Sequence, residues 1–183
     1  MEVAVPCSVW TVGHSTRSLG ELIDVLRRYG VEAVVDVRTV PRSRTNPQFN
    51  RDELQTKLPE AGIDYIHAKD LGGLRKPLND SPNSAWENES FRGFADYMQT
   101  EGFEQALGRL IDQARSKPTA IMCAETLPWR CHRSLIADAL LIRGFEIIEI
   151  FDAAKSQLHK LTSFAVVRED KVTYPQKGDA ALL

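Results

Sequence analysis

The sequence has little of what marks secreted, membrane-embedded or cross-linked proteins. It holds only three cysteines, an odd number, in a chain of 183 residues that is long enough to fold around one apolar core. We therefore expect free thiols and a reducing, cytoplasmic environment rather than a disulfide framework. No apolar run approaches the roughly 20 residues that span a bilayer. Residues 1–6 have no basic region before an apolar stretch, so we expect neither a signal peptide nor a membrane partner.

The sequence also lacks an excess of positive charge and a glycine-rich nucleotide fingerprint. Its formal net charge of -2 argues against a globally basic nucleic-acid-binding protein, although a local basic patch is compatible with it. Residues 13–16 read Gly-His-Ser-Thr, without the further glycines that dinucleotide binding needs, so we predict no nicotinamide or flavin cofactor. There is no internal repeat, and no oligomeric state follows from the sequence.

Strand-like and helix-like segments alternate along the chain. Strands are expected at residues 8–12, 31–37, 63–67, 119–123 and 146–151. Ser18 and Glu21 form a capping box that opens a helix ending at Gly30, and further helices are expected to begin near residues 50, 91, 103 and 134. This order predicts an α/β fold: a single domain with a mostly parallel, twisted sheet of about five strands and helices on both faces.

The C-terminal part of the chain has a less regular pattern. We assign residues 1–152 to the α/β domain and residues 153–183 to an extension that packs on the same domain or trails from it. Residues 164–167 are compatible with an added edge strand of the sheet. His159 is interpreted as a surface residue, and residues 177–183 are expected to fray.

The most informative stretch of the sequence begins at Cys123 and ends at Arg133. It reads Cys-Ala-Glu-Thr-Leu-Pro-Trp-Arg-Cys-His-Arg, after an apolar run and before an amphipathic one. The pattern predicts a strand end, a short loop and a helix start. It crowds thiol, imidazole, carboxylate and guanidinium groups at the carboxyl end of a strand, where an α/β sheet usually binds its ligand.

Two other expected strands also end in chemically active residues. One strand leads into His14 and Ser15, and another ends at Asp36 and is followed by Arg38. Because the carboxyl ends of parallel strands lie at one edge of a sheet, these residues should converge with the stretch that begins at Cys123. We therefore predict a ligand site at this rim.

Residues 38–51 contain four arginines and no acidic residue: Arg38, Arg42, Arg44 and Arg51. Arginine forks recognise phosphate and carboxylate groups in a bidentate manner, so this segment is a candidate for anion binding. A solvated basic loop is the plainer interpretation, and Asp36 could pair with Arg38 in a purely structural role.

The two cysteines of the central stretch are candidate nucleophiles. The helix is expected to begin near Cys131 or His132, and a thiol at a helix N-terminus has its pKa lowered. Cys123, at the strand end, is the second candidate. His132 or His14 would act as general acid or base, and Glu125 would orient a histidine or exchange protons itself.

A metal site is an alternative use of the same residues. Cys123, Glu125, Cys131, His132 and His14 offer ligands suited to zinc or iron. Their order matches the zinc nucleobase deaminases only poorly, because the second Cys-x-x-Cys of those enzymes is absent. We therefore predict no cofactor and keep a bound zinc or iron ion as the alternative.

Assembled, these motifs closely resemble the DUF488 family, whose name records that no function is agreed. The resemblance runs from about residue 9 to residue 150 and implies a compact α/β domain of the kind found in bacteria and archaea. It is carried by Gly13-His14-Ser15-Thr16, Asp36-Val37-Arg38, Pro41-Arg42-Ser43, Phe49, Leu71-Gly72-Gly73, Cys123-Ala124-Glu125 and Cys131-His132-Arg133.

The sequence thus predicts a cysteine-dependent enzyme, a hydrolase or group transferase that acts on a small anionic substrate, such as a phosphate-containing compound or nucleotide. The predicted catalytic residues are Cys123, Glu125, Cys131, His132 and His14. The predicted substrate-binding residues are Ser15, Asp36, Arg38, Arg42, Ser43, Gly72, Gly73 and Arg133.

Three alternatives stay open at this point. The segment from Arg38 to Arg51 could contact phosphates in a nucleic-acid-binding or processing module, with Phe49 or Trp86 stacking on a base. The site could hold a metal ion. Lastly, Asp36, Arg38, Glu125 and Arg133 could form a buried polar network that fixes the strand ends.

Overall fold

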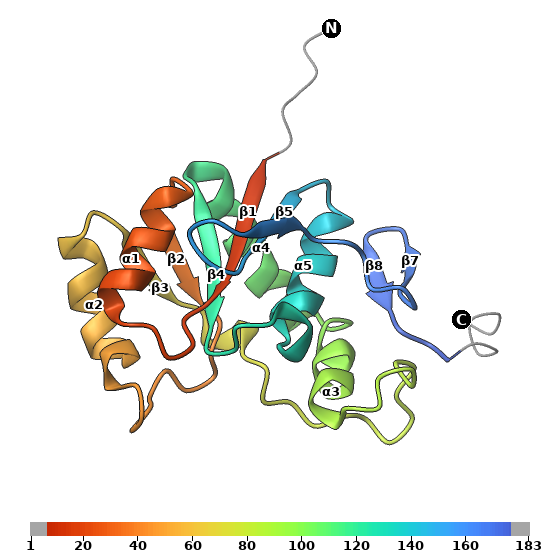
Figure 1. Ribbon diagram of the computed structural model, residues 1–183. Helices are drawn as coiled ribbons and strands as arrows, with labels where there is room; N and C mark the ends of the chain where they lie inside the picture. Colours follow the sequence, from red (N-terminus) through yellow and green to blue (C-terminus); the bar gives the residue numbers. More distant parts are fainter. Residues whose placement is uncertain (1–6, 177–183) are drawn as a thin grey trace, which may run out of the picture.

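A six-stranded sheet runs through the centre of the protein in the order β3-β2-β4-β1-β5-β6 (Figure 1). The computed structural model describes residues 7–176. The strands are β1 Ser8–Gly13, β2 Ala33–Asp36, β3 Asp64–His67, β4 Thr119–Cys123, β5 Glu146–Ile150 and β6 Ser156–Leu158. The first five run parallel to one another, and β6 runs antiparallel to β5. The predicted α/β class and mostly parallel sheet are confirmed, with a sixth, antiparallel strand added at one edge.

The residue types of the central strands explain their position. β2 reads Ala-Val-Val-Asp and β4 reads Thr-Ala-Ile-Met-Cys, and every residue of both strands is buried. Such continuous apolar runs are typical of parallel strands that are covered on both faces. The edge strand β3 instead alternates between exposed and half-buried positions.

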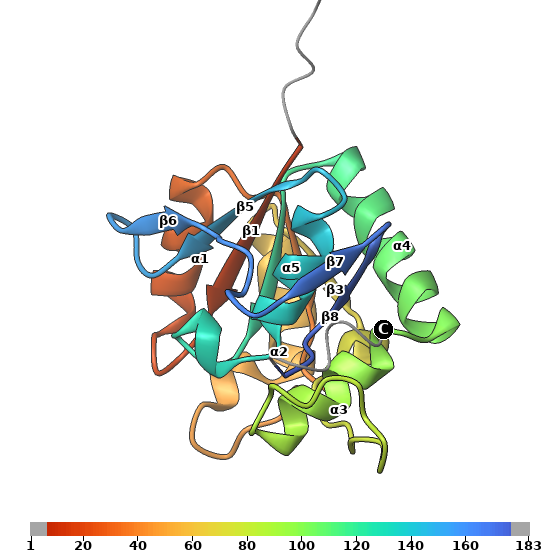
Figure 2. The ribbon, with the colours of Figure 1, turned by 90° about the vertical axis from the view of Figure 1, so that its right-hand side faces the viewer.

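Helices cover both faces of the sheet (Figures 1 and 2). α1 Leu19–Arg28 and α2 Arg51–Glu60 lie on one face, whereas α3 Glu89–Tyr97, α4 Glu101–Ser116 and α5 Arg133–Leu141 lie on the other. Two apolar clusters, one on each side of the sheet, make up the core. The predicted capping box of Ser18 and Glu21 is present at the start of α1. Short 3-10 helices occupy Pro47–Phe49, Lys69–Leu71 and Pro128–Arg130.

Asp96, a buried residue of α3, holds the long connection between β3 and α3. Its carboxylate accepts hydrogen bonds from the backbone N–H of Leu78 at 2.8 Å, from the Ser81 hydroxyl at 2.6 Å and from the Asn83 amide at 2.8 Å. Three charge-assisted bonds to one buried carboxylate order a segment that otherwise has little regular structure.

The C-terminal segment departs from the expected pattern. Residues 164–167 add no strand to the main sheet: β7 Val166–Arg168 pairs instead with β8 Lys171–Thr173 in a separate two-stranded hairpin. The added edge strand is β6, which lies earlier in the chain. The expected fraying of residues 177–183 concerns positions outside the described residues. No helix within residues 7–176 is long and apolar enough to cross a membrane.

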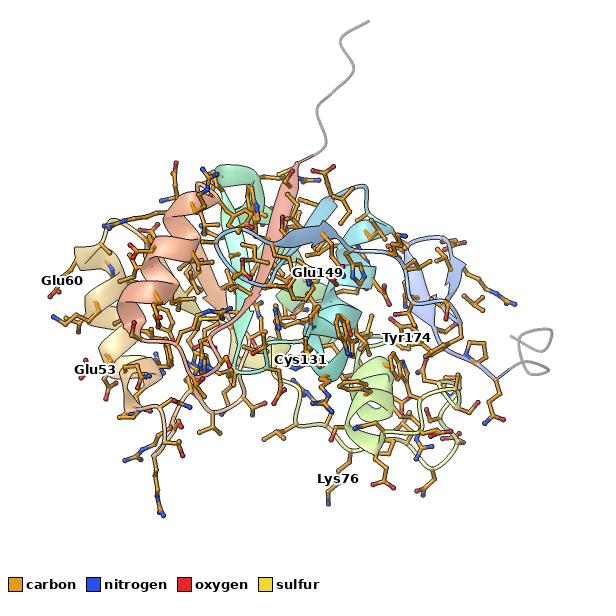
Figure 3. The ribbon with its side chains drawn as sticks, in the orientation of Figure 1. Glu53, Glu60, Lys76, Cys131, Glu149 and Tyr174 are labelled. Atoms are coloured by element: carbon orange, nitrogen blue, oxygen red, sulfur yellow. The ribbon has the colours of Figure 1, made fainter. Side chains whose placement is uncertain are left out.

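His159 is the clearest correction to the sequence interpretation, because its side chain is only 5 % exposed. Its Nε2 lies 2.8 Å from Asp138 of α5 and its Nδ1 lies 2.7 Å from Glu149 of β5. Tyr174 donates its hydroxyl to the same Asp138 at 2.8 Å; Glu149 and Tyr174 are labelled in Figure 3. Burial opposes a charge on His159, but the hydrogen bonds to the two carboxylates outweigh it and raise the pKa to about 9.

This network predicts a pH-dependent stability. The folded-state pKa of His159 exceeds its ordinary value of 6.5, so its contribution is complete below pH 6.5 and is lost as the pH rises through 9. We expect His159→Gln to lower the free energy of unfolding by about 2 kcal/mol near pH 6 and by much less near pH 10. Urea unfolding at both pH values measures the difference. The control is His67→Gln, which removes an imidazole that bonds only a carbonyl. An equal loss of stability at both pH values in His159→Gln would contradict the raised pKa of His159.

Candidate functional site

The carboxyl ends of β1, β2 and β4 meet at one rim of the sheet. Gly13 is in register with Cys123, and Asp36 is in register with Met122. Beyond the strands the pairing continues, because the His14 N–H donates to the Cys123 carbonyl at 2.9 Å and the Ser15 N–H donates to the Ala124 carbonyl at 2.9 Å. The rim is therefore a continuous surface, to which three separate segments contribute.

Gly13 allows the loop after β4 to lie directly across the end of β1. A Cβ at this position would come within 1.8 Å of the Glu125 carbonyl oxygen and 2.8 Å of the Thr126 Cα. Both obstacles are backbone atoms, so no side-chain rotation would relieve the clash. The glycine thus fixes how closely the segment that begins at Cys123 approaches the sheet.

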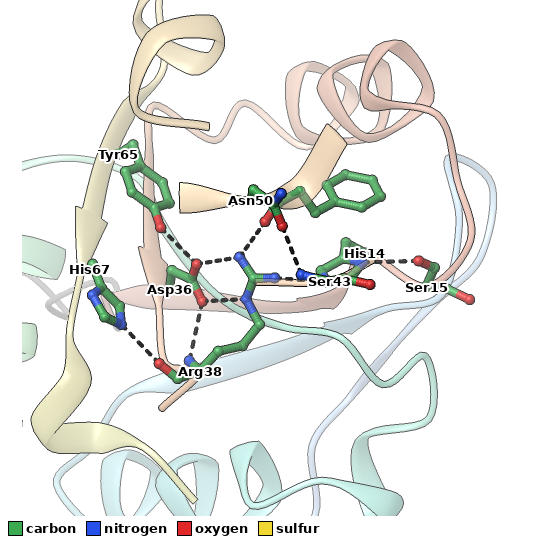
Figure 4. Close-up of polar contacts among 9 residues, drawn as sticks. His14, Ser15, Asp36, Arg38, Ser43, Asn50, Tyr65 and His67 are labelled. Carbon is green, nitrogen blue, oxygen red and sulfur yellow. Dashed lines mark hydrogen bonds and ion pairs between the residues drawn. The ribbon is translucent and has the colours of Figure 1, made fainter. Parts of the chain in front are cut away.

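Asp36 and Arg38 form a closed, buried ion pair (Figure 4). Asp36 accepts the Arg38 Nε–H at 2.9 Å, an Nη2–H at 2.6 Å and the Tyr65 hydroxyl at 2.7 Å. Arg38 also donates through Nη2 to the Phe49 carbonyl at 2.8 Å. Burial and the Asp36 charge together raise the pKa of the Tyr65 hydroxyl well above its ordinary range. This pair joins β2, β3 and the segment before α2.

His14 belongs to the same network and does not suit acid–base chemistry at neutral pH. Its Nδ1 donates to the Ser15 carbonyl at 2.9 Å and its Nε2 accepts from Arg38 Nη1 at 3.1 Å, so both nitrogens are engaged in the neutral ring. The ring is 2 % exposed and stacks on Phe49 at a centroid distance of 4.1 Å. Burial is the main cause that lowers its pKa to about 4. Of the two histidines predicted as acid or base, the geometry favours His132.

Cys123 and Cys131 face one another across the loop, with their Sγ atoms 2.8 Å apart and both thiols free. Arg133, which is 1 % exposed, donates from Nε to the Cys123 Sγ at 2.9 Å and from its backbone N–H to the Cys131 Sγ at 3.5 Å. Its other guanidinium bonds reach the Thr11 hydroxyl at 2.9 Å and the Glu125 carbonyl at 2.6 Å. Arg133 therefore lies beneath the cysteine pair.

The two thiols differ in acidity because of these contacts. The hydrogen bond from Cys123 holds the pKa of Cys131 well below its usual range, and the neighbouring His132 and Arg133 lower it further against the cost of burial. Burial raises the pKa of Cys123, and its hydrogen bond to Cys131 adds to this. Cys131 is thus the more acidic thiol of the pair, and the contacts favour the negative charge on its sulfur.

His132 is held in the orientation that a general base for Cys131 needs. Its Nε2 donates to the carbonyls of Leu71 at 2.9 Å and Val37 at 3.1 Å, which places the ring proton on Nε2. The opposite nitrogen, Nδ1, lies 3.6 Å from the Cys131 Sγ. Gly73 makes room for the ring, since a Cβ there would lie 2.4 Å from His132 Nδ1.

The cysteine pair opens into a pocket of about 330 Å³. Six of the predicted site residues line it: Arg38, Gly73, Cys123, Glu125, Cys131 and His132. The remaining wall combines apolar side chains with one exposed cation and consists of Thr39, Val40, Leu74, Ser90, Phe91, Ala124 and Arg130. Its dimensions suit a small molecule that has both apolar and charged parts.

Glu125 stands between this pocket and a neighbouring hollow of about 260 Å³, which His14 and Ser15 line. Its side chain is exposed, and within residues 7–176 its carboxylate has no hydrogen-bond or ion-pair partner. Glu125 therefore remains available to a ligand in either space.

The other predicted binding residues lie away from the pocket. Arg42 is exposed on the loop before α2, and Ser43 braces that loop through Asn46 and Asn50. Gly72 is buried where a Cβ would meet the Thr39 hydroxyl at 2.4 Å. Ser43 and Gly72 thus contribute to the packing of the surrounding loops.

Several residues of the site were not among the predicted site residues. Leu74, Phe91 and Arg130 line the pocket, and Thr11 holds Arg133 from inside β1. The sequence held a signal for Thr11, because this polar residue stands among Val9, Trp10 and Val12, two positions before Gly13 at the rim. Leu74 directly follows the Leu71-Gly72-Gly73 motif, whereas Phe91 lies far from the motifs in sequence and only the fold brings it to the site.

The described residues contain no group of three or more histidine, cysteine, aspartate or glutamate side chains arranged to hold a metal ion. The two sulfur atoms face each other, and His132 Nε2 is occupied by carbonyls. The metal alternative therefore has no donor set among residues 7–176.

Comparison with known proteins places this site within a family. A family model described as a domain of unknown function, DUF488, matches residues 18–140, which include α1, β2 and the whole stretch from Cys123 to Arg133. No curated protein and no solved structure matches the chain.

Removing the charge of Asp36 tests the buried ion pair. Asp36→Asn keeps the shape of the side chain but leaves the Arg38 guanidinium buried without a counter-charge, so we expect a loss of about 3 kcal/mol in the free energy of unfolding. Urea titration of both proteins measures it. Glu60→Gln breaks an exposed ion pair with Lys57 and should have little effect; a comparably small effect of Asp36→Asn would contradict the structural role of the pair.

Proposed function

The chain belongs to the DUF488 family, and from the chemistry of its site we propose that it is a cysteine-dependent enzyme, a hydrolase or group transferase for a small anionic substrate. The observation that carries the proposal is the contact of 3.6 Å between the Cys131 Sγ and the His132 Nδ1 inside a pocket. A thiolate beside an oriented imidazole is a recurrent arrangement for nucleophilic catalysis.

The roles within this dyad follow from which atoms are free. The Cys131 thiolate would attack an electrophilic phosphorus or carbonyl carbon, and a covalent intermediate would form as the leaving group departs. Protonated His132 would give the Nδ1 proton to that leaving group and then accept a proton from the incoming water or acceptor. Its Nε2 stays bonded to the Leu71 and Val37 carbonyls throughout, so the ring keeps its position.

Two cations of the pocket support an anionic substrate. Arg38 has five N–H groups, of which four donate to Asp36, His14 and the Phe49 carbonyl. The remaining Nη1–H belongs to a side chain that lines the pocket. Arg130 lies exposed at its edge, and within residues 7–176 it has no acidic partner. A phosphate or carboxylate group between these arginines would leave the apolar part of the substrate against Leu74 and Phe91.

Nucleic-acid binding is the second interpretation of the basic segment, and the structure supports it less than the sequence alone did. Arg38 keeps only one N–H that is not bonded within the protein, and Phe49 is buried beneath His14 and cannot stack on a base. Arg42, Arg44 and Arg51 stay exposed. They supply an ordinary basic surface patch without a stacking platform.

The proposal predicts selective alkylation of Cys131. With iodoacetamide at neutral pH, we expect Cys131 to react at least about tenfold faster than Cys7, the exposed thiol of the same chain. His132→Ala should slow Cys131 and leave Cys7 unchanged. Peptide mass spectrometry over time measures both rates, and a Cys131 rate no faster than that of Cys7 would remove the nucleophile from the proposal.

The substrate is sought with the same reagents. A panel of small phosphate esters and mononucleotides is screened for release of inorganic phosphate and for protection of Cys131 from alkylation. A true substrate should do both with the wild type and with Cys7→Ser, whereas Cys131→Ser should lose turnover. Turnover that persists in Cys131→Ser would overturn the assignment of the nucleophile.

Gly73 provides a second test of the dyad, from outside its reacting atoms. Gly73→Ala places a methyl group against the His132 ring, which the Leu71 and Val37 carbonyls hold in place. We expect the ring to shift and the alkylation rate of Cys131 to fall by roughly tenfold, without loss of the fold by circular dichroism. Gly102→Ala, where the nearest atom lies at 3.7 Å, is the matched control. Unchanged Cys131 reactivity in Gly73→Ala would contradict the orienting role of this contact.

A further inference from the structure

We propose that Cys123 and Cys131 form a redox-active dithiol that reacts with low-molecular-weight disulfides, with Cys131 as the attacking and Cys123 as the resolving residue. This inference rests on the proposed function only in sharing Cys131 as the nucleophile. It assigns to the site a second reaction, one that requires both sulfur atoms.

The geometry of the pair suits an internal disulfide. The two Sγ atoms lie 2.8 Å apart in the reduced protein, and a disulfide bond needs about 2.05 Å. The two residues come from different supports, the end of β4 and the segment just before α5, and the loop of residues 124–130 joins them. A displacement of less than about 1 Å is small for side chains at a loop boundary.

The surroundings divide the two roles. Cys131 accepts hydrogen bonds from the Cys123 thiol and the Arg133 backbone N–H and lies beside His132, so it holds the negative charge that attack requires. Cys123 is 3 % exposed and lies against the Arg133 guanidinium. Once Cys131 is bound in a mixed disulfide, Cys123 no longer donates to a thiolate, and Arg133 favours its ionised form.

The reaction balances in two exchange steps. The Cys131 thiolate attacks one sulfur of the small disulfide RSSR, forming Cys131–S–SR and releasing RS⁻. Cys123 gives up its proton to solvent and attacks the Cys131 sulfur, so that a Cys123–Cys131 disulfide forms and a second RS⁻ leaves. The two thiolates take up protons from solvent as RSH, so one RSSR is reduced to two RSH for each dithiol oxidised.

Arg133 makes this disulfide easy to reduce. In the reduced protein the buried guanidinium is stabilised by a neighbouring thiolate, and oxidation removes that charge. Stabilisation of the reduced form favours an oxidising pair. In the oxidised state Cys131 is not a nucleophile, so the same exchange would also switch off the proposed hydrolase or transferase.

The closing experiment uses oxidised glutathione as the small disulfide and the full chain with Cys7→Ser, which removes the unrelated exposed thiol. We expect this protein to become lighter by two hydrogen atoms, to lose alkylation at both remaining cysteines and to regain it with dithiothreitol. Cys7→Ser/Cys123→Ser should stop with one glutathione on Cys131, and this adduct should last at least roughly tenfold longer than in the protein that keeps Cys123.

The outcomes separate the two proposals. If the glutathione adduct on Cys131 lasts equally long with and without Cys123, the dithiol proposal is overturned, while fast alkylation of Cys131 leaves the proposed function standing. If the internal disulfide forms readily and no phosphate ester is turned over, the dithiol is supported and the hydrolase or transferase is not. Absence of any glutathione adduct on Cys131 in Cys7→Ser/Cys123→Ser overturns the dithiol.

Discussion

The site is organised around the buried guanidinium of Arg133. Arg133 is the largest fully buried side chain among the described residues, and within residues 7–176 no carboxylate lies within ion-pair distance of it. Its hydrogen bonds go to the Thr11 hydroxyl, the Glu125 carbonyl and the Cys123 sulfur. A buried cation is costly without a compensating anion, and the nearest group that can supply one is the cysteine pair. The lowered pKa of Cys131 comes first from its hydrogen bond with Cys123, and His132 and the buried Arg133 add to it.

The order of the fold, and the convergence of residues at the rim, could be predicted from the sequence. Strand ends at Gly13, Asp36 and Cys123 are marked by the change from apolar to polar residues. Because the strands are parallel, these ends lie at one edge of the sheet. The Asp36–Arg38 pair, which the sequence offered as a structural alternative, is present in the structure. The sulfur, hydroxyl and carbonyl partners of Arg133 could not be predicted. They depend on the packing of distant segments, which the sequence pattern around Arg133 does not specify.

The roles of His14 and His159 could not be predicted from the sequence either. His14 stands in a motif and His159 does not, so the sequence suggested chemistry for the first and a surface position for the second. In the structure His14 is neutral because it lies between a carbonyl and an arginine, whereas His159 is charged because it lies between Asp138 and Glu149. Those two carboxylates come from α5 and β5, and they meet at His159 only because β6 adds to the sheet edge. A titratable residue cannot be interpreted before its neighbours are known.

The rim contains two buried arginine networks, and the difference between the partners of the two arginines explains why only one network offers a candidate nucleophile. Asp36 pairs with Arg38 through a carboxylate, which is a poor nucleophile. Around Arg133 the corresponding place is taken by sulfur, which can carry the negative charge and also form covalent bonds. Both networks restrain the same strand ends, and His132 lies between them through its bond to the Val37 carbonyl. The rigid pair thus restrains His132, and the sulfur pair adds two thiols to an otherwise structural arrangement.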